Sequence, residues 1–188
     1  YAQSERVIRQ LLAEAGRAPK SAAMSQAVAR DDSEAAAAVA LLKSPETYLG
    51  FARAERFVSP GGLIRGRPAD YRSAPLKLNG WALEGDWSVG KESASSTRPG
   101  AKIHYRFQAR DLHLVLASPG GGPVRFKVTL DGQAPGADAG GDINADGYGV
   151  IRGERLYQLI RNKRDVRERN FTIEFFDAGA EAFAFTFG

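Results

Sequence analysis

The feature that most constrains this chain is a two-residue alternation of apolar and polar side chains in its second half. In the run 102–109, apolar Ile103, Tyr105 and Phe107 alternate with polar residues. Successive side chains of a β-strand point to opposite faces, so this alternation predicts a strand with one buried face. Comparable runs occur at 112–116, 124–130, 171–175 and 183–187.

Turn signals separate these runs and set the expected fold class. Asp131-Gly132 is a strong hairpin signal, and the chain's 21 glycines are scattered, as many tight turns require. After residue 70 neither helical periodicity nor β-α-β spacing is found. The sequence therefore predicts a mainly β fold, a jelly-roll-like antiparallel β-sandwich, over residues 44–188, with an irregular stretch at 44–70 before the main strands.

A short α-helical segment is expected to precede the sandwich. Within residues 1–17, Ile8, Leu11, Leu12 and Ala15 recur at helical spacing. A helix of about a dozen residues is marginal alone, so we expect it to dock on a domain outside this chain, with upstream sequence missing. Residues 18–43 are rich in alanine and predict a linker, with a second helical run at 34–42.

Composition excludes several kinds of chemistry. The chain has no cysteine, so it offers no thiol nucleophile, disulfide or thiolate metal ligand. Its 26 basic and 22 acidic residues give a formal charge of +4, too small a surplus to indicate nucleic-acid binding without a concentrated patch. No apolar stretch approaches the roughly 20 residues that span a bilayer, so this segment is not expected to insert into a membrane.

One loop matches half of a calcium-binding motif. Asp142, Asn144 and Asp146 offer oxygen at alternate positions, and Gly147 follows for the turn. The bidentate acid expected at Gly153 is absent, and a metal-free polar turn is the alternative. Calcium is the one cofactor that the sequence leaves open.

Four aromatic residues are candidates for ligand binding: Trp81, Trp87, Tyr148 and Tyr157. Aromatic rings offer flat apolar platforms to sugar rings, although such residues in a β domain also fill the core. Trp87 lies between Asp86 and Ser88, which favours exposure.

No catalytic constellation is found. His104 and His113 are the only histidines, and we expect them to be surface neighbours across a hairpin without a nucleophile or third metal ligand. The basic run 161–169 predicts a solvated hairpin loop rather than a nucleic-acid site. A carboxylate pair for glycoside hydrolysis cannot be read from sequence, because its separation is spatial.

A spaced set of segments resembles the C-terminal region of DipZ-type thiol-disulfide interchange and cytochrome c biogenesis proteins. The segments are SPETYLG at 44–50, RAERF at 53–57, WALEGDW at 81–87, RLYQLIR at 155–161 and AFTFG at 184–188. The resemblance implies that residues 1–17 are the remnant of the last helix of a missing thioredoxin-like domain. It also implies that the sandwich is similar to carbohydrate-binding modules.

The resemblance carries over no catalytic residue, because the Cys-x-x-Cys motif of that family is absent here. It implies a non-catalytic accessory module outside the cytoplasm, in the periplasm or cell envelope. Two roles stay open. One is binding of a glycan, and the other is a purely structural role in which the module packs on the thioredoxin-like domain of the same parent chain and positions it.

Overall fold

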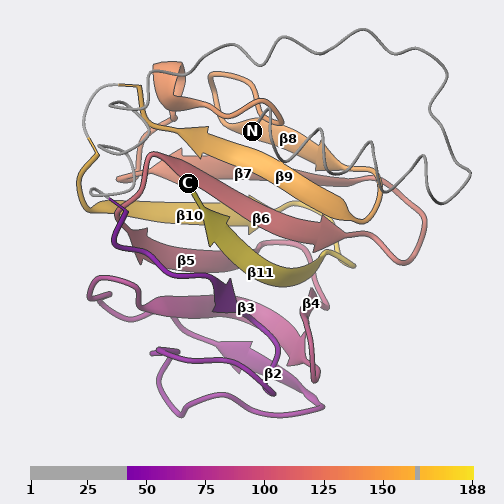
Figure 1. Cartoon of the computed structure of the whole chain (residues 1–188). Coiled ribbons are helices and arrows are strands. Elements are labelled where there is room, and N and C mark those ends of the chain that lie inside the picture. The colour runs from indigo at the N-terminus through magenta and orange to yellow at the C-terminus, as the bar shows by residue number, and fades with distance from the viewer. Residues whose placement is uncertain (1–41, 164–165) are drawn as a thin grey trace, which may run out of the picture. The chain divides into compact units, whose positions relative to one another are not determined.

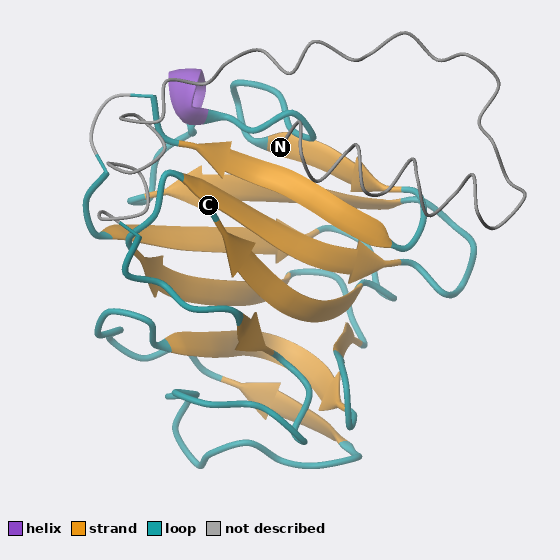
Figure 2. Cartoon of the chain, in the orientation of Figure 1, coloured by secondary structure: helices purple, strands orange, loops and turns teal. Residues whose placement is uncertain are grey.

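The structure, a computed structural model, describes residues 42–163 and 166–188. The predicted helix at 1–17 and almost all of the predicted linker at 18–43 lie outside the described residues. Strands dominate the described part, and its one short helix is the 3-10 turn η1 (Figure 2). The elements are β1 (Thr47–Tyr48), β2 (Pro68–Tyr71), β3 (Trp81–Val89), β4 (Ala94–Ser96), β5 (Ala101–Phe107), β6 (Asp111–Ala117), β7 (Val124–Leu130), η1 (Gly136–Asp138), β8 (Tyr148–Ile151), β9 (Arg155–Arg161), β10 (Arg169–Phe175) and β11 (Glu181–Phe187).

The strands form one antiparallel sheet that curls into two facing layers. Its order is β8-β7-β10-β5-β3-β4-β11-β6-β9, with β1 beside β11 and β2 beside β3. In Figure 1, β6, β9 and β11 lie in front of β5, β7 and β10. We call β9, β6, β11, β4 and β1 the front layer, and β8, β7, β10 and β5 the back layer. The predicted mainly β, antiparallel, jelly-roll-like sandwich is confirmed.

Strand β3 connects the two layers by bending. Its first half, from Trp81 to Glu84, pairs with β5 of the back layer, and its last residues, from Trp87 to Val89, pair with β4 of the front layer. Gly85 lies between these halves with φ 82°. A side chain is strained at such a positive φ, so glycine permits the corner at which the strand changes layers.

The core lies between the layers and is built from the inward half of each alternating strand. Its members include Ile103, Leu114, Phe126 and Ile173, all with 0% exposure. Ring contacts join the layers directly, since Phe171 of β10 lies 5.8 Å from Phe185 of β11 and Phe126 of β7 lies 6.4 Å from Tyr157 of β9. The alternation in the sequence therefore corresponds to real burial.

Strand β11 departs from simple alternation. Its pairing with β6 shifts register between Ala182 and Phe185, so an extra residue is accommodated there. Ala182 and Phe185 both belong to the core cluster, whereas Phe183 is half-buried and outside it. A β-bulge of this kind redirects one side chain, here Phe183, to the outer face of the front layer.

Two expected hairpins are instead crossovers between layers. Strand β5 pairs with β3 and β10, and β6 pairs with β11 and β9, so the prediction that His104 and His113 are neighbours is wrong. The loop 161–169 likewise joins β9 of the front layer to β10 of the back layer, so it is not a hairpin. Sequence alternation cannot tell which strands pair, because both arrangements bury the same faces.

Candidate functional site

A row of polar side chains crosses the outer face of the back layer. Strand register places Glu84 opposite Lys102, Lys102 opposite Glu174, Glu174 opposite Lys127, and Lys127 opposite Tyr148. We call these five residues the polar row. Neighbouring strands lie about 4.8 Å apart, so a row over five strands extends roughly 19 Å. It alternates acid and base and ends on an aromatic ring.

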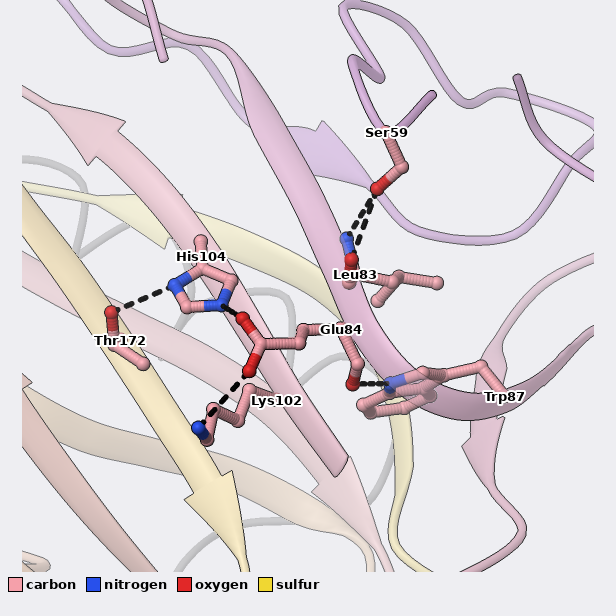
Figure 3. Close-up of polar contacts among 7 residues, drawn as sticks. All are labelled: Ser59, Leu83, Glu84, Trp87, Lys102, His104 and Thr172. Carbon is pink, nitrogen blue, oxygen red and sulfur yellow. Dashed lines mark hydrogen bonds and ion pairs between the residues drawn. The ribbon is translucent and has the colours of Figure 1, made fainter. Parts of the chain in front are cut away.

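Glu84 organises one end of the polar row (Figure 3). Its carboxylate accepts a hydrogen bond from Lys102 Nζ at 3.1 Å and contacts His104 Nε2 at 3.0 Å. His104 Nδ1 lies 3.0 Å from Thr172 Oγ1. A carboxylate only accepts, so Nε2 carries the hydrogen and Nδ1 accepts from the Thr172 hydroxyl. These bonds connect side chains of β3, β5 and β10 on the outer face of the back layer.

The charges of this cluster follow from its surroundings. Partial burial favours the neutral form of Glu84, but hydrogen bonding to Lys102 and the nearby charges outweigh it and lower the pKa of this carboxyl. Burial is also the main influence on His104 and lowers its pKa, against the opposing effect of Glu84. At neutral pH an ionised Glu84 therefore lies beside a neutral imidazole.

Tyr148 ends the polar row and is the most exposed large apolar residue in the described part, at 48%. Lys127 Nζ lies 4.9 Å from the centroid of its ring, a cation–π distance. The centroid of the Phe176 ring lies 6.1 Å from that of Tyr148. Of the four aromatic residues predicted to bind ligand, Tyr148 alone presents its ring at the surface.

The other three predicted ligand-binding aromatics are buried. Trp81 and Trp87 have 0% exposure and Tyr157 has 1%, so the expected exposure of Trp87 is wrong. The indole N–H of Trp87 donates to the backbone oxygen of Glu84 at 3.0 Å, and its ring packs edge-on against Phe175 at 5.8 Å. The polar neighbours that suggested exposure point to the other face of β3, since alternate residues of a strand point to opposite faces.

The loop with Asp142, Asn144 and Asp146 is a well-bonded turn that leads into Tyr148. Asp142 accepts from Arg155 and from the backbone N–H of Gln158, both at 2.7 Å. Asn144 Oδ1 accepts the backbone N–H of Tyr148 at 2.8 Å. Protein donors thus already occupy the oxygens of two candidate calcium ligands. The calcium prediction stays a prediction.

Gly147 closes this turn and requires glycine. Its φ is 90°, and a Cβ atom there would lie 2.1 Å from the backbone oxygen of Val128. The sequence pattern that resembled a calcium loop therefore has a structural reason of its own. It brings the turn against β7 and orients Tyr148.

The basic loop 161–169 and its surroundings are occupied by ion pairs. Arg161 and Arg110 both bond the buried carboxylate of Asp111, at 2.7 and 2.9 Å. Arg169 and Arg167 contact Asp131, with Arg169 Nε 2.5 Å from its carboxylate. Each of these two carboxylates thus pairs with two arginines, and the prediction that the run is not a nucleic-acid site stays a prediction.

Two adjoining cavities, which no sequence pattern indicated, lie at the edge of the front layer. One, of about 440 Å³, is lined by Tyr48, Gly50, Ala52, Arg53, Lys91, Glu92, Phe183 and Ala184. The other, of about 370 Å³, is lined by Glu46, Thr47, Tyr48, Ala52, Arg53, Glu55 and Arg56. Tyr48 and Arg53, which line both, lie in the segments 44–50 and 53–57 that carried the family resemblance.

Within residues 42–163 and 166–188, no group of three or more His, Cys, Asp or Glu side chains is arranged to hold a metal ion. In the same ranges no helix has the length and apolar character needed to cross a membrane.

A match to a known protein family spans most of the chain. A family model described as the thioredoxin-like C-terminal domain matches residues 44–188. The proteins named Protein DipZ from Mycobacterium bovis and Mycobacterium tuberculosis are each 26% identical over 188 residues, all of this chain. The chain spans 24% of the length of these relatives.

Solved structures show only distant likeness. A family two carbohydrate esterase from Clostridium thermocellum in complex with cellohexaose has a TM-score of 0.40 at 12% identity, over 52% of this chain and 27% of its own. A Podospora anserina GH26-CBM35 beta-(1,4)-mannanase has a TM-score of 0.36 at 11% identity, over 75% of this chain and 26% of its own. Likeness at this level supports no inference about ligand or mechanism.

Proposed function

The chain belongs to the thioredoxin-like C-terminal domain family, and from that premise we propose that it is a non-catalytic accessory module of a longer thioredoxin-like protein. We place this parent protein outside the cytoplasm, and we propose that the module binds carbohydrate on the outer face of its back layer. Redox chemistry would belong to the rest of the parent, because this chain has no cysteine.

The observation that carries the carbohydrate proposal is the polar row with Tyr148 at its end. A sugar ring has apolar C–H faces and hydroxyl edges, so it is bound by an aromatic platform beside fixed hydrogen-bonding groups. Tyr148 supplies the platform at 48% exposure. Lys127 and Glu174, its neighbours in the row, supply a donor and an acceptor for hydroxyl groups.

The rigidity of this surface supports the proposal further. The Asp142–Gly147 turn holds Tyr148, and the Glu84 hydrogen bonds hold the opposite end of the row. A preformed site loses little conformational entropy on binding, so the ordering of side chains opposes the binding of a glycan only weakly.

The experiment is isothermal titration of the purified chain with neutral oligosaccharides of cellulose, mannan and xylan type. We expect saturable binding to one of them, weakened at least about 10-fold in Tyr148→Ala, as for truncation of a hot-spot tyrosine. Val58→Ala is the matched control, because Val58 is also exposed, at 37%, but lies outside the row. Absence of binding to all three, or equal binding by Tyr148→Ala, would refute the proposal.

A second candidate function, packing on the thioredoxin-like domain of the parent, is favoured by apolar side chains on the outer face of the front layer. Leu156 is 39% exposed and lies opposite the half-buried Val115 in the β6–β9 pairing, and Phe183 lies on the same face. Adjacent exposed apolar residues are typical of protein interfaces. Mixing the chain with that domain, produced separately, should give a complex that Leu156→Glu weakens.

A further inference from the structure

We propose that the cavity beside Arg53 binds a sugar unit that carries a carboxylate, a uronic acid. The choice of a sugar rests on the carbohydrate binding proposed above, whereas the carboxylate is inferred from the cavity itself. This would be a second site, on the front layer and separate from the polar row.

A fixed turn positions Arg53. The backbone N–H groups of Phe51 and Ala52 donate to Gly90 at 2.9 Å and to Lys91 at 3.0 Å, and that of Arg53 donates to Gly50 at 3.2 Å. A Cβ atom on Gly50 would lie 2.2 Å from the backbone carbon of Glu92, so the two segments are in direct contact. The turn therefore has little freedom to move.

The Arg53 guanidinium is oriented but has no acidic partner. Its central carbon lies 3.2 Å from the centroid of the Tyr48 ring, a stacking contact that orients the group. Among the described residues no carboxylate forms an ion pair with it, although many other arginines of this part do. A guanidinium has five N–H donors, so one that is held against a ring and forms no ion pair can bind a planar carboxylate through two parallel hydrogen bonds.

Charge on the larger cavity favours an anion. Arg53 and Lys91 lie on its walls with Glu92 as the single acid, so the cations outnumber the acids by two to one. The smaller cavity has two acids, Glu46 and Glu55, against two cations, Arg53 and Arg56, and is balanced. We therefore place the carboxylate in the larger cavity and a neutral neighbouring unit of the chain in the smaller one.

The apolar part of the larger cavity's lining suits a pyranose ring. Phe183, redirected outward by the β11 bulge, lies there with Ala184 and Gly50. Its volume of about 440 Å³ is within the range of about 300–1,000 Å³ found for small-molecule sites. An apolar lining beside a cation can contact the ring face and the carboxylate of a uronic acid at once.

The test is titration of the whole chain with oligogalacturonate and, in parallel, with its neutral methyl ester. We expect saturable binding of the acid form that falls about 10- to 100-fold in Arg53→Gln, which loses a charge-assisted bidentate contact, and that weakens with added salt. Val58→Ala, at an exposed position outside both cavities and the polar row, should bind the acid form as the wild type does. Circular dichroism of Arg53→Gln checks that it is folded.

Three results would overturn this assignment: no binding of oligogalacturonate, equal binding of acid and ester, or binding unchanged in Arg53→Gln. The proposal on the polar row is judged separately, since neutral oligosaccharides and Tyr148→Ala report on it. Should the acid form bind but depend on Tyr148 instead of Arg53, the carboxylate site is wrong and the row alone binds glycan.

Discussion

Replacing Trp87 by alanine should destabilise the whole domain instead of removing a surface contact. The side chain is fully buried, packs edge-on against Phe175 at 5.8 Å and donates a hydrogen bond to the backbone of Glu84 at 3.0 Å. Truncating a buried tryptophan costs about 3–5 kcal/mol, and the lost hydrogen bond adds about 1 kcal/mol. That is a large share of the roughly 5–15 kcal/mol that stabilises a typical domain.

The measurement is urea unfolding and thermal melting followed by circular dichroism. For a chain of this size each kcal/mol shifts the melting temperature by about 2–4 °C, so a total loss of about 4–6 kcal/mol predicts a fall of roughly 8–24 °C. Trp87→Phe keeps a ring against Phe175 but loses the N–H donor, and should fall between wild type and Trp87→Ala. Val58→Ala, at an exposed position, should change stability by less than about 0.5 kcal/mol.

Tryptophan fluorescence gives an independent check. Both Trp81 and Trp87 have 0% exposure, so iodide should quench the folded chain little and the urea-unfolded chain strongly. A Trp87→Ala variant within about 1 kcal/mol of wild type, or strong quenching of the folded chain, would refute the packing described above. In that case Trp87 would again be a candidate for ligand contact.

The remaining predictions concern the stability of the chain at acidic pH, the loop before β8 and calcium binding. Hydrogen bonds from Arg161 and Arg110 outweigh burial and lower the pKa of Asp111, so its contribution is present above the ordinary carboxyl pKa and is lost as pH falls through the folded value. Asp111→Asn should cost about 1.5–3 kcal/mol at pH 7 and flatten the acid limb of stability against pH, and an unchanged limb would count against this role. Gly147→Ala should destabilise the chain by more than about 1 kcal/mol in urea unfolding, because its Cβ would contact the Val128 backbone oxygen at a positive φ, and a neutral effect would show that the turn relaxes. Millimolar calcium should leave the melting temperature unchanged, since protein donors occupy the Asp142 oxygens, whereas a rise would establish the metal site.

Local sequence information predicted the strands well but could not predict which of them pair. The period-two runs at 102–109 and 124–130 correspond to β5 and β7, because burial of one face imposes the alternation directly. Alternation does not reveal the crossovers after β5 and β9, and for this reason His104 was wrongly expected to lie beside His113. Pairing is decided by contacts between residues far apart in the chain.

The candidate sites show the same division. By itself the sequence determined a cysteine-free, antiparallel β module with aromatic candidates, since composition and alternation are local properties. Only the tertiary structure decided that Trp87 is core and Tyr148 is surface, because a ring's exposure depends on what the opposite layer covers. It also brought Tyr48, Arg53 and Phe183 to one cavity, where a bulge in the last strand and a turn near the first meet. Such contacts depend on packing between segments far apart in the chain, which no single stretch of sequence determines.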